Sequence, residues 1–241
     1  MQTQVQQPLN DVKDSRQRFK EAHWFDWLQE KWVLVLGQGS IGSWTTLFLS
    51  RIGCNIYSYD MDVVSSLNMA GQFYGLGSVG KFKVTAIKEA LEEYSQPNKM
   101  IFESTKYDEN GVSMSITIAA FDNMLARKVA FNNWVEYVNI LTEGEKKQCI
   151  FIDGRLSVED YYIYAVRPGQ EEEYRKTLFD DSEGEELSCS LKSTSHCAAG
   201  IASDITSILT NFAVNVKEDC EIREVPFSIH KSIQSYTYET K

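Results

Sequence analysis

Three features are missing from the 241-residue sequence: a CxxC cysteine pair, an apolar run of about 18 residues, and an excess of positive charge. Its five cysteines, an odd number without paired spacing, indicate reduced thiols rather than a disulfide framework. Without the apolar run we expect no transmembrane helix, and the polar start MQTQVQQPLNDVKDSR lacks the apolar segment of a secretory signal. These absences predict a cytoplasmic protein with no membrane partner.

The charge balance of the chain is acidic, with 24 basic and 34 acidic side chains and a formal net charge of −10. Such a surface repels phosphate backbones and anionic lipids, so we expect neither nucleic acid nor a membrane surface as partner. A content of 43% hydrophobic residues is too high for a disordered chain, and the length suffices to bury a core. We expect one domain over residues 1–241, with a helical arm at 1–30 and an acidic loop at 170–197.

Short apolar runs alternate with helical periodicity along the chain. Residues 32–36 form an apolar, β-branched run before a glycine, which predicts a buried strand, and residues 41–52 continue with helical spacing. The further strands expected are 55–59, 114–121, 149–153 and 161–166, and the further helices are 79–94, 123–140 and 198–216. Asn10 or Asp11 could cap an N-terminal helix running towards Gln29. The alternation predicts an α/β fold, a Rossmann-like, doubly wound, mainly parallel sheet flanked by helices, with a small C-terminal β extension over the weakly alternating residues 221–241.

A GxGxxG motif, Gly37-Gln38-Gly39-Ser40-Ile41-Gly42, lies between the first expected strand and helix. Gly37 permits a tight turn, Gly39 lets the backbone approach a phosphate, and Gly42 lets helix and strand pack closely. Free N–H groups and the positive end of the helix then favour an anion. We therefore expect a nucleotide here, bound by Gly37, Gly39, Ser40, Ile41 and Gly42.

Asp60 ends the second expected strand, where its carboxylate can accept hydrogen bonds from ribose hydroxyls. A second glycine-rich segment, residues 75–81, matches the GxxxxGK half of a phosphate-binding P-loop. However, Phe82 replaces the Ser or Thr that would hold magnesium, and no strand precedes the loop. We interpret this segment as the start of the following helix, from which Lys81 and Lys83 could reach phosphate oxygens.

Five motifs follow one another in a recognisable order: the glycine loop, Asp60-Met61-Asp62, Asn68-Met69-Ala70-Gly71-Gln72, Gly80-Lys81-Phe82-Lys83, and Asp122-Asn123 with Arg127 downstream. Over roughly residues 15–216 this order resembles the ThiF/MoeB/ubiquitin-activating enzyme superfamily, with its D-x-D, N-x-x-R-Q, G-x-x-K and D-N motifs. Members of that superfamily adenylate protein C-termini. The resemblance implies an ATP-binding adenylyltransferase that forms an acyl-adenylate and releases pyrophosphate.

The resemblance also implies roles for individual residues. The catalytic residues would be Asp122, Lys83, Asn68 and Gln72, and the nucleotide would further contact Asp60, Asp62, Lys81 and Asn123. Asp122 would hold Mg²⁺, since it follows a strand of an open α/β sheet, where such sheets bind ligands, and oxygen ligands suit a hard cation. The carboxylate activated by ATP would belong to a small ubiquitin-like or sulfur-carrier protein or to a peptide, and the enzyme would be a homodimer.

One position departs from the family pattern: Gly71 stands where the N-x-x-R-Q motif has its arginine. A cation that would neutralise phosphate charge is therefore missing, although Arg16 or Arg18 could substitute from a neighbouring subunit. Two alternatives stay open. One is a pseudoenzyme or adaptor of the same fold that binds nucleotide, and the other is an NAD-dependent oxidoreductase, since the glycine loop and Asp60 would also suit NAD.

Many members of the superfamily hold a structural zinc between two CxxC pairs. This sequence has no CxxC pair, so we expect no structural zinc here. Cys189, His196 and Cys197 are spaced too widely for a typical zinc site. Cys189 lies in the crossover loop before the last long helix, where family members often place a reactive cysteine. A thiolate there could accept the adenylated carboxylate as a thioester, and an inert loop cysteine is the alternative.

Overall fold

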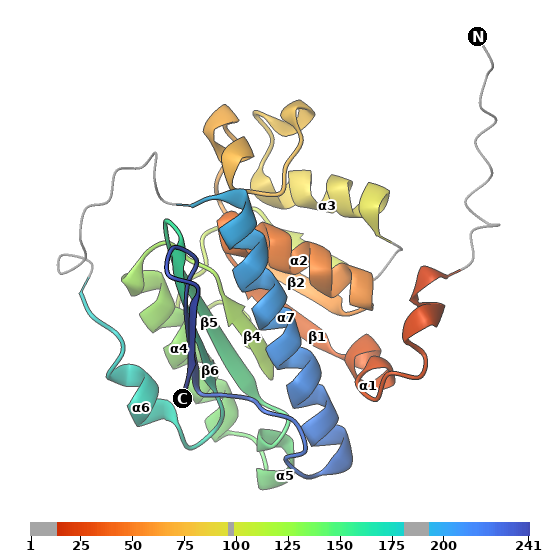
Figure 1. Cartoon of the computed structure of the whole chain (residues 1–241), viewed down its shortest axis with the longest axis vertical. Helices are drawn as coiled ribbons and strands as arrows, with labels where there is room; N and C mark the ends of the chain where they lie inside the picture. Colours follow the sequence, from red (N-terminus) through yellow and green to blue (C-terminus); the bar gives the residue numbers. More distant parts are fainter. Residues whose placement is uncertain (1–13, 96–98, 181–192) are drawn as a thin grey trace.

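One mixed eight-stranded sheet runs through residues 14–95, 99–180 and 193–241, the part of the chain that the computed structural model describes (Figure 1). Its order is β3-β2-β1-β4-β5-β6-β7-β8. The strands are β1 (Trp32–Leu36), β2 (Asn55–Tyr59), β3 (Met100–Glu103), β4 (Ile116–Ala119), β5 (Ile150–Ser157), β6 (Asp160–Val166), β7 (Ser228–Ser232) and β8 (Thr237–Thr240). Neighbouring strands in the part β3-β2-β1-β4-β5 pair in parallel. The pairs β5-β6, β6-β7 and β7-β8 are antiparallel. This mainly parallel sheet, with helices beside it, confirms the predicted α/β class.

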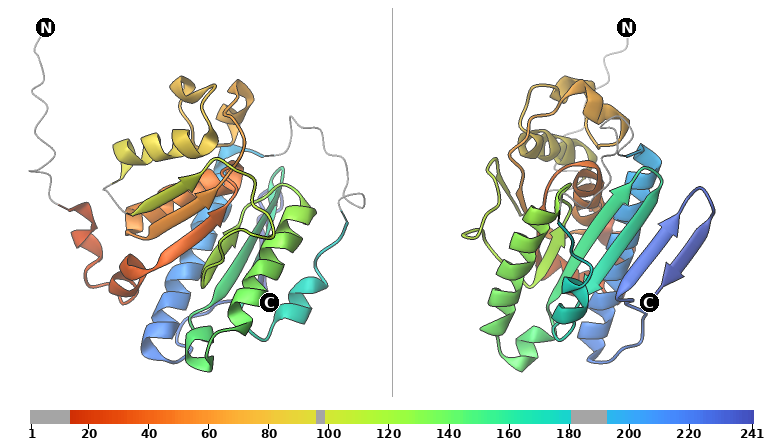
Figure 2. Two further views of the ribbon diagram at one scale, coloured as in Figure 1. Left: turned by 180° about the vertical axis from the view of Figure 1, so that it is seen from behind. Right: turned by 90° about the vertical axis from the view of Figure 1, so that its left-hand side faces the viewer.

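Helices cover both faces of the sheet (Figure 2). The α-helices are α1 (Phe25–Glu30), α2 (Ser40–Ile52), α3 (Lys83–Tyr94), α4 (Met124–Asn139), α5 (Glu143–Lys146), α6 (Glu171–Arg175) and α7 (Ser195–Glu218), and the 3-10 helices are η2 (Ser15–Phe19), η3 (Ser66–Ala70) and η4 (Leu76–Ser78). Alternate residues of β1 face opposite layers, as the period of a strand requires. Val33 and Val35 pack in the core with α2 and α7, whereas Leu34 and Leu36 pack in the core with α4 and α6.

The longest helix, α7, is 24 residues long and, by length and composition alone, apolar enough to cross a membrane. Ten of its residues are buried, and they pack against β5, β6 and α2 in the main core. A core helix of this kind passes the same test of length and composition. We therefore interpret α7 as the helix that closes one face of the sheet, in the place where the sequence predicted a helix over 198–216.

The C-terminal half of the sheet departs from the parallel pattern. Strand β5 continues to Ser157, turns at Val158 and pairs antiparallel with β6, and β7 and β8 add a hairpin at the edge. The weak alternation over 221–241 thus does form strands. Strand β3 was not predicted because its four residues are half-buried or exposed and give little apolar signal.

Two predicted helices have different bounds in the structure. Asn10 and Asp11 lie outside the described residues, and from Asp14 on the arm forms η2 and α1 instead of one helix to Gln29, with the rings of Phe19 and Trp24 packed together across the intervening turn. The helix predicted over 79–94 begins only at Lys83, because Gly80 has φ +91° and interrupts the helical conformation.

Candidate nucleotide site

The glycine loop lies at the carboxyl end of β1 between the ends of β2 and β4. Gly37 has φ +91°, in the left-handed region, and its N–H donates to Tyr59 O at 2.9 Å. A Cβ on Gly37 would lie 2.9 Å from Ala120 O, and a Cβ on Gly42 would overlap the carbonyl oxygen of Gly37. Both positions therefore require glycine, for conformation and space at the first and for space at the second.

The first turn of α2 presents free backbone donors. Its N-cap is Gly39, and the N–H groups of Ser40, Ile41 and Gly42 have no hydrogen-bond acceptor among the described residues. A Cβ on Gly39 would meet no atom within 4 Å, so the space outside this turn is open. Unpaired N–H groups at the positive end of a helix favour an anion such as phosphate.

Asp60 is held against the glycine loop. Its Oδ2 accepts a hydrogen bond from the Gln38 N–H at 2.6 Å, and its Oδ1 accepts one from the Asp62 N–H at 2.8 Å. Burial raises the pKa of this carboxyl above its ordinary value of 3.8, although the ammonium group of Lys83 and the two N–H donors oppose the rise. The carboxylate thus lies at the end of β2, where it can accept hydrogen bonds from a ribose.

Tyr74 contacts the same loop and was not singled out in the sequence. Its hydroxyl donates to Gln38 O at 2.6 Å, and burial raises the pKa of this hydroxyl well above 10. Tyr74 is therefore a neutral donor that fixes the loop from the side of the segment between β2 and α3. The buried side-chain amide of Gln38 also holds the loop, because it donates hydrogen bonds to the hydroxyl groups of Thr46 on α2 and Ser58 on β2.

The two lysines of the G-x-x-K motif have carboxylate partners of their own. The Nζ of Lys83 lies 2.7 Å from Oδ2 of Asp62, and its side chain is 9% exposed against 57% for Asp62. Lys81 pairs with Glu89 at the surface. Only Lys83 is therefore a buried cation beside Asp60.

The segment between the D-x-D motif and α3 packs on the first turns of α2. The Phe73 N–H donates to Ser43 Oγ at 2.9 Å. Asn68 accepts a hydrogen bond from the Ser65 N–H in a capping box, so its carbonyl oxygen has a structural task. The side-chain oxygen of Gln72 is buried without a hydrogen-bond donor among the described residues. A ligand with a donor group could satisfy it.

Asp122 and Asn123 lie at the carboxyl end of β4, next to the glycine loop. Asn123 caps α4 by accepting a hydrogen bond from the Ala126 N–H at 2.8 Å, and its amide donates to Asp122 at 3.2 Å. Among the described residues no group of three His, Cys, Asp or Glu side chains could hold a metal ion. A magnesium ion at Asp122 would therefore draw most of its ligands from phosphate and water.

Arg127, the arginine downstream of Asp122-Asn123, lies inside the fold. It is buried and paired with the fully buried Asp153, and it donates to the carbonyl oxygens of Phe121 and Gly154. Asp153 also accepts from Arg155 at 2.7 Å and from the hydroxyl of Tyr174 at 3.0 Å. Arg127 thus fixes the loop that carries Asp122, and it does so from inside the fold.

Other candidate residues lie elsewhere. Cys189 lies outside the described residues. Cys197 is buried in α7, and burial raises the pKa of its thiol to about 11, which leaves it unreactive. Arg16 lies beside Gly53, at the carboxyl end of α2, and so about 20 Å from the glycine loop by helix length.

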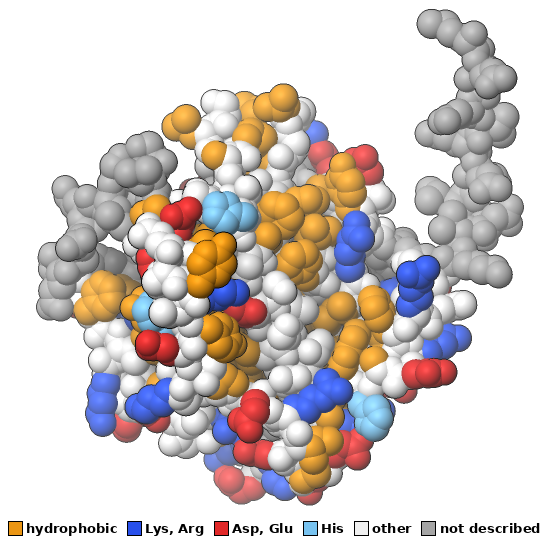
Figure 3. Space-filling view, viewed as in Figure 1, with side chains coloured by type: hydrophobic (Ala, Val, Ile, Leu, Met, Phe, Trp, Pro, Cys, Tyr) orange, Lys and Arg blue, Asp and Glu red, His pale blue; other side chains and the backbone are white. Residues whose placement is uncertain are grey.

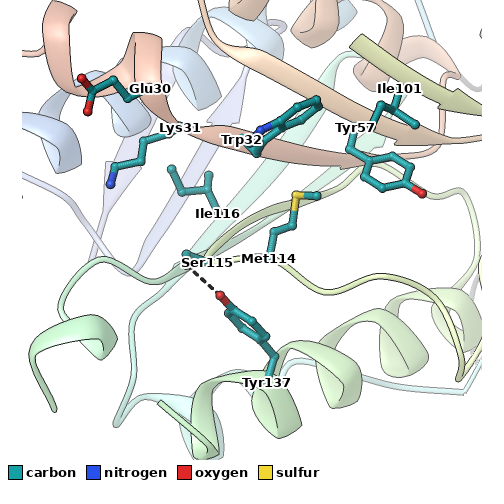
Figure 4. A pocket seen from close by; sticks show the side chains of 9 residues that line it. All are labelled: Glu30, Lys31, Trp32, Tyr57, Ile101, Met114, Ser115, Ile116 and Tyr137. Carbon is teal, nitrogen blue, oxygen red and sulfur yellow. Dashed lines mark hydrogen bonds between the residues drawn. The ribbon is translucent and has the colours of Figure 1, made fainter. Parts of the chain in front are cut away.

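A hollow lies at the opposite end of the strands (Figure 4). Its volume is about 410 Å³, and its lining includes Trp32 at the start of β1, Tyr57, Met114 and Tyr137. Because Trp32 and the glycine loop flank opposite ends of β1, this hollow is separate from the candidate nucleotide site.

These features are typical of a nucleotide site in a protein of the doubly wound α/β class. The chain belongs to the ThiF family, whose model matches residues 16–220, and this confirms the resemblance carried by the motifs. No curated protein sequence matches the chain.

Similar solved structures share the fold. They include E. coli MccB with ATP (16% identity, TM-score 0.67), MccB in complex with N-formylated MccA (16%, 0.67) and PaaA (13%, 0.66). Each match covers 91% of this chain and 65% or 66% of the other. The chain thus spans slightly less than two thirds of their length, and at these identities the likeness shows the fold alone.

Proposed function

We propose that this protein uses ATP to adenylate the carboxylate of a peptide or small carrier protein. The observation that carries the proposal is the ThiF family match over residues 16–220, and the hydrogen bond from the glycine loop to Asp60 supports it. Phosphates would lie at the free N–H groups of α2, and the ribose would lie at Asp60.

The reaction joins two anions, a carboxylate and the α-phosphate, and releases pyrophosphate. Cations and oriented donors must therefore offset charge in the transition state. The described residues that can supply this are the N–H groups of α2 and the ammonium group of Lys83, with Mg²⁺ held by Asp122. We propose that Asn68, Gln72, Lys81 and Asn123 also contact the nucleotide.

The substrate is proposed to bind beside the segment between β2 and α3. This segment exposes an unusual number of large apolar side chains: Met61, Val63, Leu67, Leu76, Val79 and Phe82. Figure 3 shows such side chains at the top of the molecule, where this segment lies. MccB has been crystallised with MccA as well as with ATP, which supports a peptide as one substrate class. A ubiquitin-like or sulfur-carrier protein remains the other.

We further propose a cytoplasmic homodimer. Arg16 lies too far from the glycine loop of its own chain to contact a nucleotide there. A role for Arg16 or Arg18 at the site therefore requires a second subunit. Sedimentation that shows only monomers at micromolar concentration would contradict the dimer.

A nucleotide-binding pseudoenzyme is the second candidate, and Gly71 is the observation that favours it. ATP–pyrophosphate exchange distinguishes the two. Exchange that depends on an added peptide or a carrier ending in Gly-Gly supports the enzyme. Tight ATP binding without exchange or a trapped acyl-adenylate supports the pseudoenzyme.

A further inference from the structure

We infer that Ser193 is a polyphosphate-binding residue that occupies the place of the arginine missing at Gly71. The inference rests on the proposed function and adds a residue that none of the five motifs contains. It is carried by three residues from distant parts of the chain that meet at the first turn of α2: Ser40, Gly71 and Ser193.

The side chain of Ser193 lies directly at the amino end of α2. Its Oγ is 2.6 Å from Oγ of Ser40, the first residue of that helix. Gly71 lies on the other side, and its carbonyl oxygen accepts a hydrogen bond from the indole N–H of Trp44 on α2. The Ser193 hydroxyl therefore borders the same free N–H groups that make this turn an anion site.

A side chain at position 71 would displace the Ser193 hydroxyl from its position beside α2. A Cβ on Gly71 would lie 2.5 Å from Oγ of Ser193 and 3.3 Å from its carbonyl oxygen. Gly71 has φ −124° and ψ −24°, and because this φ is negative the backbone does not require glycine; the contact that a Cβ would disturb most is the one with the Ser193 hydroxyl. The glycine at position 71 thus leaves room for the Ser193 hydroxyl beside α2.

The pair of hydroxyl groups keeps a proton for a ligand. Only one proton can lie between two hydroxyl oxygens, so the accepting hydroxyl still has its own proton to donate. Neither Ser40 nor Ser193 has another side-chain hydrogen bond within the described parts of the chain. Phosphate oxygens are strong acceptors, and hydrogen bonds to charged groups are stronger than those between neutral groups.

The backbone holds Ser193 in this position. It pairs in an isolated parallel bridge with Val158, at the turn between β5 and β6. Val158 has φ +57°, which is rare for a β-branched residue. Ser193 is thus tied to the sheet as well as to α2, and its hydroxyl is oriented before a ligand arrives.

Calorimetric titration with Mg-ATP and with AMP tests the inference. Ser193→Ala should weaken ATP binding by about tenfold or more and leave AMP binding within about twofold, because AMP lacks the β- and γ-phosphates. Gly71→Ala should give the same selective loss, since its Cβ displaces the Ser193 hydroxyl. Ser195→Ala, exposed two residues further on, should change neither affinity.

Each other outcome overturns the inference. Equal ATP affinity in folded Ser193→Ala and the unaltered protein would remove Ser193 from the site, and an equal loss for ATP and AMP would show that Ser193 does not bind the β- and γ-phosphates. If the unaltered protein binds ATP, either result leaves the proposed function intact. An unaltered protein that binds no ATP would overturn both.

Discussion

Lys83 and Asp62 form an ion pair of 2.7 Å in which the cation is nearly buried and the carboxylate is largely exposed. The cation whose charge opposes the rise in the pKa of Asp60 is therefore paired with Asp62. A triphosphate must compete with Asp62 for the ammonium group. We therefore expect the loss of Lys83 to be visible in catalysis.

Lys83→Ala should lower ATP–pyrophosphate exchange by about a hundredfold or more, since it removes the nearly buried ammonium group beside Asp60. Lys88→Ala is the matched control, because Lys88 lies on the exposed face of the same helix. Equal rates in the two variants would show that Lys83 does not act on the nucleotide.

Asp122→Ala should lower exchange by a similar factor of about a hundred, because the proposed magnesium ligand is lost. Its melting temperature should change little, since the only hydrogen bond of this carboxylate within the described residues comes from the neighbouring Asn123. Cys189→Ala should affect exchange far less, because adenylation precedes any thioester. The reverse order of the two effects would mean that the roles are misassigned.

Asp60→Asn should change how stability depends on pH. Burial raises the pKa of Asp60 in the folded protein above its ordinary value of 3.8. The stability linked to this group is therefore present below pH 3.8 and is lost as the pH rises through the raised pKa. Asp60→Asn lacks this loss, so its free energy of unfolding should improve relative to the unaltered protein over that interval. Urea unfolding at a series of pH values measures it.

The exposed Asp26→Asn on α1 is the control for general charge effects. A parallel pH dependence of the unaltered protein and Asp60→Asn would contradict the assigned pKa shift.

Arg127→Ala should destabilise the fold by about 3–5 kcal/mol, because it leaves a buried carboxylate with one partner fewer. Chemical unfolding should show this loss, while Arg51→Ala at the exposed end of α2 should stay within about 0.5 kcal/mol of the unaltered protein. A small effect of Arg127→Ala would show that the Arg155 and Tyr174 contacts suffice for Asp153.

The sequence was most informative where one residue type answers one local demand. Gly37 and Gly42 are required by conformation and close packing, and the alternation of strands and helices follows from burial of apolar residues. Contacts between segments that are distant in the sequence could not be predicted from it. Nothing near Ser193 in the sequence shows that it meets Gly71, and the motif position of Arg127 does not reveal its buried partner.

The buried ion pair of Arg127 and Asp153 stabilises the fold and is distinct from the residues proposed to act on the nucleotide. Asp122, the residue proposed to hold magnesium, lies at the surface, and within the described residues its carboxylate has a hydrogen bond from the neighbouring Asn123 alone, so its removal should leave the fold intact. Removal of the Arg127–Asp153 pair, in contrast, should destabilise the fold. A single substitution at Asp122 could therefore abolish the proposed adenylation and still leave a folded protein.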